Sequence, residues 1–463
     1  MSLVVSMASS LAQAPTIRAE MHEPLELLCM VARLAGHEEY QQHRSDPAYG
    51  REAMAHFESQ KEHAAVKRLR ELRQSHGISY DAIAGLAVHL GPMPDLAPRT
   101  PLSPRPPMLD ARWDGADADG FVVMLRDFAK ASDAAKFFAA HTELYREAES
   151  RLSMRLSHSK ALPWFDVFFG KRDGASCTPV VGLLCGGQNY GVSVQHTDGK
   201  PDELRPVFGC WRFDSEGKPE FGDEMLWIFA HELCHSYTNP IVERHLARLK
   251  KAGDALFLLN ERAMRRQAYA SSRIVLCETF VRACVIRCMA DTEGAVAGQR
   301  QAKVEEKNHF PWAAEIAALL VEYQNDRKRY GDFDAFVPRI AEALDAIAAK
   351  SKPEADRAPR LVSMTPENGA SDVDPAMTEL VITFDRPMRD QSWSVVGKPA
   401  DTPKVTGSPR YDAARKVLTI PVQLESGRSY RFSLNSGEKR GFQSEDGVAL
   451  EPVEVRFATR AAK

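Results

Sequence analysis

The sequence contains GDEMLWIFAHELCHSYTNP at Gly222–Pro240, and the centre of this stretch is HELCH, an H-E-x-x-H pattern. Asp223 is a suitable N-cap, the residues after it are mostly apolar, and the final Asn-Pro pair predicts the end of a helix. On such a helix His231 and His235 lie one turn apart on the same face, so both imidazoles can reach one metal ion. The same spacing places Glu232 beside the metal, where its carboxylate can handle a bound water.

Two histidines do not complete a catalytic metal site, which needs a third protein ligand. We expect Glu278 to supply it, because this carboxylate lies in the mostly apolar stretch Ser271–Cys288 and a buried carboxylate needs a metal or a charge partner. Arg282, one turn later, is the alternative partner. The two interpretations are compatible, because neighbouring groups normally hold a ligating carboxylate in place. Glu243 and Glu261 are the reserve candidates.

Along the chain on both sides of this motif, the spacing of apolar residues predicts helices, then a few strands, then helices again. We expect helices over residues 24–90, a strand at Gly120–Leu125 (GFVVML), a helical stretch over 127–156, strands within 178–196 and 205–213, and helices over 223–349. Residues 91–107 carry seven prolines and predict an extended connector.

A composition break at residues 351–358 predicts a linker, because the segment is polar, charged and proline-bearing. After it the apolar period changes from 3.6 to 2, in four alternating runs separated by turn residues. Residues 359–463 therefore predict an antiparallel β-sandwich. The segment Thr365–Met388, the LESGRSYRFSL run and the closing VRFAT resemble a bacterial immunoglobulin-like domain.

Composition excludes several classes of protein. The 463 residues include 60 Lys and Arg against 63 Asp and Glu, a near-balance that argues against a nucleic-acid binder with a general basic surface. No apolar run approaches the roughly 18 residues that a membrane-spanning helix needs. Eight cysteines are too few for a fold built on disulfides.

The N-terminus suggests a compartment. Residues 4–14 have the sequence VVSMASSLAQA and end in Ala12-Gln13-Ala14. Small residues at both alanine positions are what a signal peptidase requires. We therefore expect residues 1–20 to be a signal-peptide remnant and the protein to be exported, periplasmic or extracellular; an ordinary disordered N-terminus is the alternative.

The segments HELCHSYTNP (His231–Pro240) and CETFVRA (Cys277–Ala283) resemble a family of exported bacterial proteins that is similar to gluzincin metallopeptidases. The resemblance implies an α+β fold: a mostly helical zincin-like catalytic domain with a small sheet over residues 21–350, followed by the all-β sandwich. It also implies one Zn²⁺ per chain, with His231, His235 and Glu278 as ligands and Glu232 as general base.

Zincins hold a peptide substrate along an edge strand above the motif helix, and GGQNYGVSV (Gly186–Val194) is the best candidate for that strand. The alternative is a hairpin turn at the two glycines with Tyr190 in the core. For the catalytic group that stabilises the oxyanion, Tyr190, Tyr237 and Tyr330 all remain candidates.

We expect a zinc-dependent hydrolase, most simply a metallopeptidase that cleaves a peptide or protein substrate. The alternative is a cell-surface or periplasmic binding or adhesion protein with a structural or vestigial zinc site, whose immunoglobulin-like domain binds a surface or a protein partner. A structural site is closed by four protein ligands. No fourth ligand is evident near the motif, so the sequence favours the enzyme.

Overall fold

The structure is a computed structural model, and it describes residues 17–41, 48–351, 353–437 and 439–461. Most of the expected signal-peptide remnant therefore lies outside the described residues. The chain divides into two compact units, formed by residues 1–250 with 273–344 and by residues 251–272 with 345–463. In the described residues, no helix is both long enough and apolar enough to cross a lipid bilayer.

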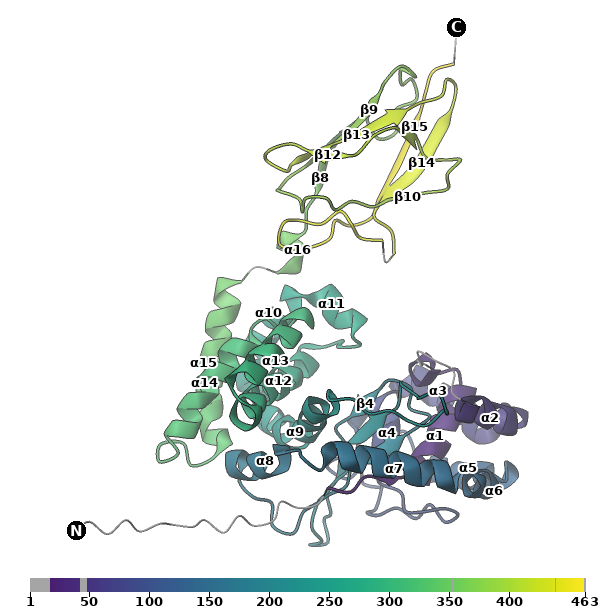
Figure 1. The fold of residues 1–463 in the computed structure, drawn as a ribbon, viewed down its shortest axis with the longest axis vertical. Coiled ribbons are helices and arrows are strands. Elements are labelled where there is room, and N and C mark those ends of the chain that lie inside the picture. Colours follow the sequence, from purple (N-terminus) through teal and green to yellow (C-terminus); the bar gives the residue numbers. More distant parts are fainter. Residues whose placement is uncertain (1–16, 42–47, 352, 438, 462–463) are drawn as a thin grey trace, which may run out of the picture. The chain divides into compact units, whose positions relative to one another are not determined.

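Helices dominate the first unit (Figure 1). The α-helices in the described parts of both units are α1 (Glu23–Leu34), α2 (Ala48–Phe57), α3 (Ala64–His76), α4 (Asp81–Val88), α5 (Ala118–Ala131), α6 (Ala134–Ala140), α7 (Thr142–Leu156), α8 (Ala161–Phe169), α9 (Met225–Arg244), α10 (Leu246–Leu259), α11 (Glu261–Arg266), α12 (Ser272–Glu293), α13 (Ala295–Lys307), α14 (Ala313–Asn325), α15 (Phe333–Lys350) and α16 (Glu354–Arg357). The predicted helical regions are thus confirmed, and α16 lies within the segment expected to be a linker. The proline-rich residues 91–107 form irregular turns inside the first unit.

The strand predicted at Gly120–Leu125 is wrong, because these residues lie in α5. Asp117 caps this helix by accepting a hydrogen bond from the Gly120 backbone N–H at 3.0 Å. The buried side chains of Phe121, Leu125 and Phe128 recur at helical spacing. A short apolar run is compatible with both the helical period of 3.6 residues and the strand period of 2. Here the N-cap and the long apolar stripe favour the helix.

The predicted end of the motif helix at Asn239-Pro240 is also wrong, since α9 continues through Pro240 to Arg244. A proline inside a helix leaves the carbonyl four residues earlier without its usual N–H donor. That carbonyl belongs to Ser236, and Arg172 Nη2 donates to it at 2.7 Å. The helix begins with Glu224, not Asp223, as its N-cap residue.

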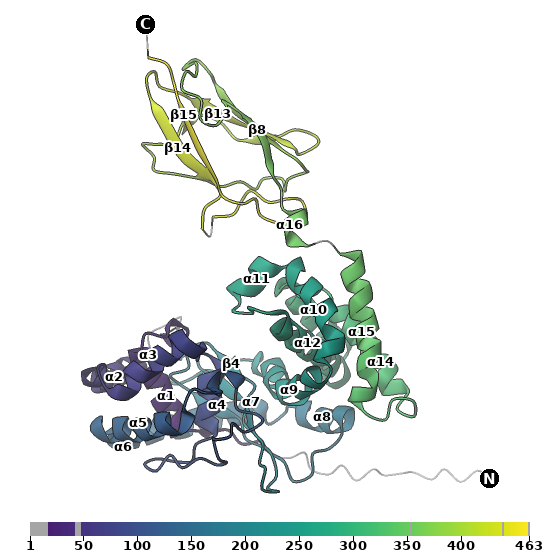
Figure 2. The ribbon, with the colours of Figure 1, turned by 180° about the vertical axis from the view of Figure 1, so that it is seen from behind.

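Short strands form two small sheets in the first unit. They are β1 (Glu20–Met21), β2 (Ser176–Cys177), β3 (Val180–Gly182), β4 (Asn189–Tyr190), β5 (Ser193–Val194), β6 (Glu203–Leu204) and β7 (Val207–Gly209). The larger sheet has the order β1-β3-β7-β4, with the first three strands parallel and β4 antiparallel to β7 at one edge. Helix α7 packs on β1 and β3. Helix α9 packs on β4 (Figures 1 and 2).

The second unit contains the predicted sandwich. Its strands are β8 (Leu361–Thr365), β9 (Glu379–Phe384), β10 (Val395–Val396), β11 (Lys404–Val405), β12 (Arg410–Tyr411), β13 (Val417–Gln423), β14 (Ser429–Leu434) and β15 (Val453–Ala458). All pair antiparallel, in the sets β10-β14-β15 and β11-β13-β9-β8, and β12 also pairs with β13. Every second residue along β9, β13 and β14 is buried, so the predicted period of two is confirmed.

Candidate metal centre

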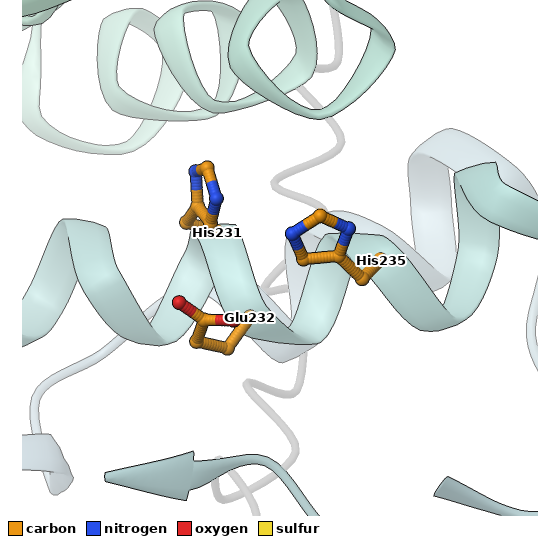
Figure 3. A group of neighbouring side chains, drawn as sticks. All are labelled: His231, Glu232 and His235. Atoms are coloured by element: carbon orange, nitrogen blue, oxygen red, sulfur yellow. The ribbon is translucent and has the colours of Figure 1, made fainter. Parts of the chain in front are cut away.

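Three side chains from two helices meet at the motif. His231 and His235 lie on α9 with ring centroids 5.0 Å apart, and α12 supplies Glu278. The Nε2 atom of each histidine is 3.6 Å from a carboxylate oxygen of Glu278. Figure 3 shows the two imidazole rings neighbouring each other along α9, with the Glu232 side chain next to them. The predicted third ligand is therefore placed against both histidines.

These distances fit a metal ion. Ligand atoms at about 2.0–2.1 Å from a tetrahedral metal lie about 3.3–3.5 Å from one another. The contacts of 3.6 Å from Glu278 to His231 and His235 are close to this separation. One ring nitrogen of each of these histidines and one carboxylate oxygen of Glu232 also lie within 4.8 Å of one another. Glu278 thus contacts both imidazoles, and Glu232 completes a second close group with the same two histidines.

A buried ion-pair chain holds Glu278. Arg282 Nη2 lies 2.9 Å from Glu278 Oε2, and the same guanidinium pairs with Glu305 of α13. Glu305 is fully buried, and it accepts hydrogen bonds from Gln301 Nε2 at 2.5 Å and from Asn308 Nδ2 at 3.3 Å. The alternative Glu278–Arg282 ion pair is thus present together with the contacts of Glu278 to both histidines. The Arg282 guanidinium is shared between the carboxylates of Glu278 and Glu305.

The side chain of Asn239 contacts His235. Asn239 lies one turn further along α9, and its Oδ1 is 3.3 Å from His235 Nδ1. When Nδ1 carries the proton and donates it to Asn239, Nε2 is left free to bind a metal. The Asn-Pro pair predicts only a helix end, but the i+4 spacing of Asn239 from His235 also indicates a contact between the two side chains.

The protonation states suit a metal centre. Burial lowers the pKa of His231 to about 3, so its imidazole is neutral, the form that binds metals. Burial alone would raise the pKa of Glu278, but the charge of the Arg282 guanidinium lowers it, and the pKa lies at about 2, so the carboxylate is ionised. Burial and the charge of Glu278 raise the pKa of Glu232 well above its usual value. A bound divalent cation would oppose that shift by favouring the ionised form.

The edge strand β4 lies directly on the motif helix. Gly191 follows β4, and a Cβ atom built there would be 2.4 Å from the carbonyl oxygen of Glu232 and 2.6 Å from the Cβ of His235. Only glycine allows the two backbones to approach this closely. Within the segment predicted as the substrate strand, Asn189–Tyr190 thus form an edge strand that packs on the motif helix, whereas Ser193–Val194 form β5 of the second sheet.

The three candidate tyrosine hydroxyls have different surroundings. Tyr190 is 5% exposed and its ring packs near Tyr40, as expected for a core residue, so its catalytic role stays a prediction. The Tyr237 ring stacks on Phe165 and lies under the Arg172 guanidinium at 4.3 Å. The hydroxyl of Tyr330 donates to Glu322, at 2.8 Å.

The reserve ligands do not join the centre in place of Glu278. Glu243 pairs with Arg273 and keeps 42% of its side chain exposed. Glu261 pairs with Arg265 at 2.8 Å and keeps 37% exposed. Both carboxylates thus have a cationic partner and access to water, so neither needs a metal.

Comparison with known proteins places most of the chain in one family. The model described as "Domain of unknown function (DUF4932)" matches residues 26–343. The chain belongs to the DUF4932 family. All the residues of the candidate centre lie inside the DUF4932 match. A second model, described as a bacterial Ig-like domain, matches residues 355–459 and confirms the predicted immunoglobulin-like tail. No curated protein matches the chain.

Solved structures offer only weak likenesses. CopC from Methylosinus trichosporium OB3b is 17% identical over 23% of this chain and 96% of its own, with a TM-score of 0.19. The S-layer protein rSbsC(31-844) is 18% identical over 50% of this chain and 33% of its own, with a TM-score of 0.17. Likenesses of this size support no conclusion about function.

Proposed function

We propose that this DUF4932 protein is a zinc-dependent hydrolase, most simply a metallopeptidase. The observation that carries the proposal is the contact of Glu278 with both motif histidines, with Glu232 adjacent. Two imidazoles and one carboxylate are the protein ligands of a common catalytic zinc centre, which keeps its fourth position for water or substrate.

Each residue then has a role. His231, His235 and Glu278 would hold the cation. When bound, zinc would polarise the scissile carbonyl and lower the pKa of a water molecule. Glu232 would accept a proton from the attacking water and deliver it to the leaving amine. Arg282 would keep the Glu278 carboxylate ionised and aimed at the centre.

A peptide is the substrate class that the surroundings favour. The edge strand β4 lies over α9, held there by the close approach at Gly191. An extended peptide can add to a free strand edge through main-chain hydrogen bonds. A peptide bond bound in this way would lie near Glu232, whose carboxylate oxygen is within 4.8 Å of the histidine nitrogens.

Metal removal tests the proposal. Purified protein is expected to contain about one zinc per chain and to cleave members of a peptide library. Dialysis against a chelator should abolish cleavage, and added zinc should restore it. The variants His231→Ala and His235→Ala should lose zinc, whereas His158→Ala, an exposed histidine on the loop after α7, should keep it.

Two results would contradict the proposal. Zinc that stays in both motif variants would show that the centre is not the metal site. A zinc-loaded wild-type protein that cleaves no peptide would favour the alternative expected from the sequence, a binding or adhesion protein with a structural or vestigial site.

Loss of the Asn239 side chain is expected to weaken zinc binding about 10–100-fold, the usual effect of removing a group that orients a metal ligand. Asn239→Ala removes the acceptor 3.3 Å from His235 Nδ1. Titration of zinc against a chromogenic chelator measures the change. Asn239→Asp keeps an acceptor oxygen and is the matched control, with affinity retained. Equal affinity in Asn239→Ala and wild type would show that this contact does not orient His235.

A further inference from the structure

Two buried thiols face each other away from the candidate metal centre. Cys29 lies on α1, and Cys185 lies in the loop between β3 and β4. Their Sγ atoms are 3.3 Å apart, and both side chains are fully buried. The two residues are 156 positions apart in the sequence, so this contact joins distant segments of the first unit.

Local packing directs Cys185 toward α1. Gly182 leaves room for the thiol, because a Cβ atom built at that glycine would lie 2.3 Å from Cys185 Sγ and 3.2 Å from Leu25 of α1. A disulfide requires an S–S bond of about 2.03–2.05 Å. The sulfur atoms, 3.3 Å apart, therefore need to approach by about 1.3 Å.

We propose that Cys29 and Cys185 form a disulfide bond when the protein folds in an oxidising compartment. Each thiol loses its proton, and the pair of electrons passes to the disulfide of a thiol–disulfide oxidoreductase, which is reduced to two thiols as the new Sγ–Sγ bond forms. Because both sulfurs are excluded from solvent in the folded protein, exchange takes place before the loop closes over α1. Disulfides form and persist in the compartments through which exported proteins pass.

The bond would anchor the approach to the edge strand. Cys185 lies just ahead of β4, and the loop after Gly182 leads directly into that strand. A cross-link between α1 and this loop closes a long segment of chain, the case in which a disulfide most restricts the unfolded state. Loss of the bond is therefore expected to lower the melting temperature by on the order of 10 °C.

Peptide mapping tests the bond directly. The full chain, directed through an oxidising compartment by a secretion leader, is denatured in an alkylating reagent without reductant and then digested. We expect a cross-linked pair of peptides that contain Cys29 and Cys185, lighter by two hydrogens than the sum of the reduced peptides. Alkylation of both cysteines in this unreduced sample would overturn the proposal.

Melting curves recorded with and without reductant distinguish a disulfide bond from simple packing of the two cysteine side chains. Reductant should lower the melting temperature of the wild type but leave that of Cys29→Ala and Cys185→Ala unchanged, because those variants lack the bond. Cys177→Ala is the matched control and should respond to reductant like the wild type. Equal melting temperatures of the wild type with and without reductant would also contradict the bond.

Discussion

Replacement of Glu232 by glutamine is expected to slow peptide hydrolysis by about 10²–10⁴-fold, the usual contribution of a positioned general base. Glutamine has almost the same shape but cannot accept the proton of the attacking water. Glu232 is only 8% exposed, so a neutral replacement adds no buried charge and the fold should remain stable. The zinc content should stay near one per chain, because His231, His235 and Glu278 are unchanged.

The measurement combines kcat/KM on a fluorogenic peptide with metal analysis and a melting curve. Glu243→Gln is the matched control, because Glu243 lies on the same helix but pairs with Arg273 at the surface. That variant should retain wild-type activity. An active Glu232→Gln variant would remove Glu232 from the mechanism, and a variant that has lost its zinc would instead assign this carboxylate to the metal.

The contacts of the motif were predictable from local spacing. His231 and His235 at i and i+4 must share a helix face. Glu278 was identifiable because an ionisable group in a long apolar helix needs a partner, and the structure supplies Arg282 together with the two histidines. In the tail, buried and less buried residues alternate along β9 and β13. This alternation fixes which residues face the core, because a shift of the strand register by one residue would turn the apolar side chains toward solvent.

What the sequence did not reveal depends on contacts between distant segments. Pro240 is tolerated inside α9 because Arg172, 64 residues from Ser236, donates to the carbonyl that the proline leaves without a donor. Glu305 lies in a polar helix, and nothing in its own segment marks it as the partner of Arg282. The close approach of Gly191 to the motif helix likewise appears only once β4 is placed at the sheet edge.

Loss of the Glu278 charge is expected to weaken zinc binding by more than the roughly 10–100-fold that is typical of a residue outside the ligand shell. Glu278→Gln keeps the size of the side chain but removes the charge of a carboxylate whose two oxygens each lie 3.6 Å from the Nε2 atom of one histidine. The metal-free protein should lose little stability, because Arg282 keeps its second carboxylate partner, Glu305. Zinc titration and thermal melting of the same sample measure both quantities.

Arg282 and Glu305 provide the matched variants. Arg282→Met leaves two buried carboxylates without their shared cation, so the metal-free protein should lose about 3–5 kcal/mol of stability. Zinc should recover part of that loss, because it binds the folded state and neutralises Glu278. Glu305→Gln removes only the outer partner, and its zinc affinity should fall within the 10–100-fold range. If Glu278→Gln binds zinc as tightly as the wild type, then Glu278 serves only as the ion-pair partner of Arg282, and the third ligand is the neighbouring Glu232 carboxylate.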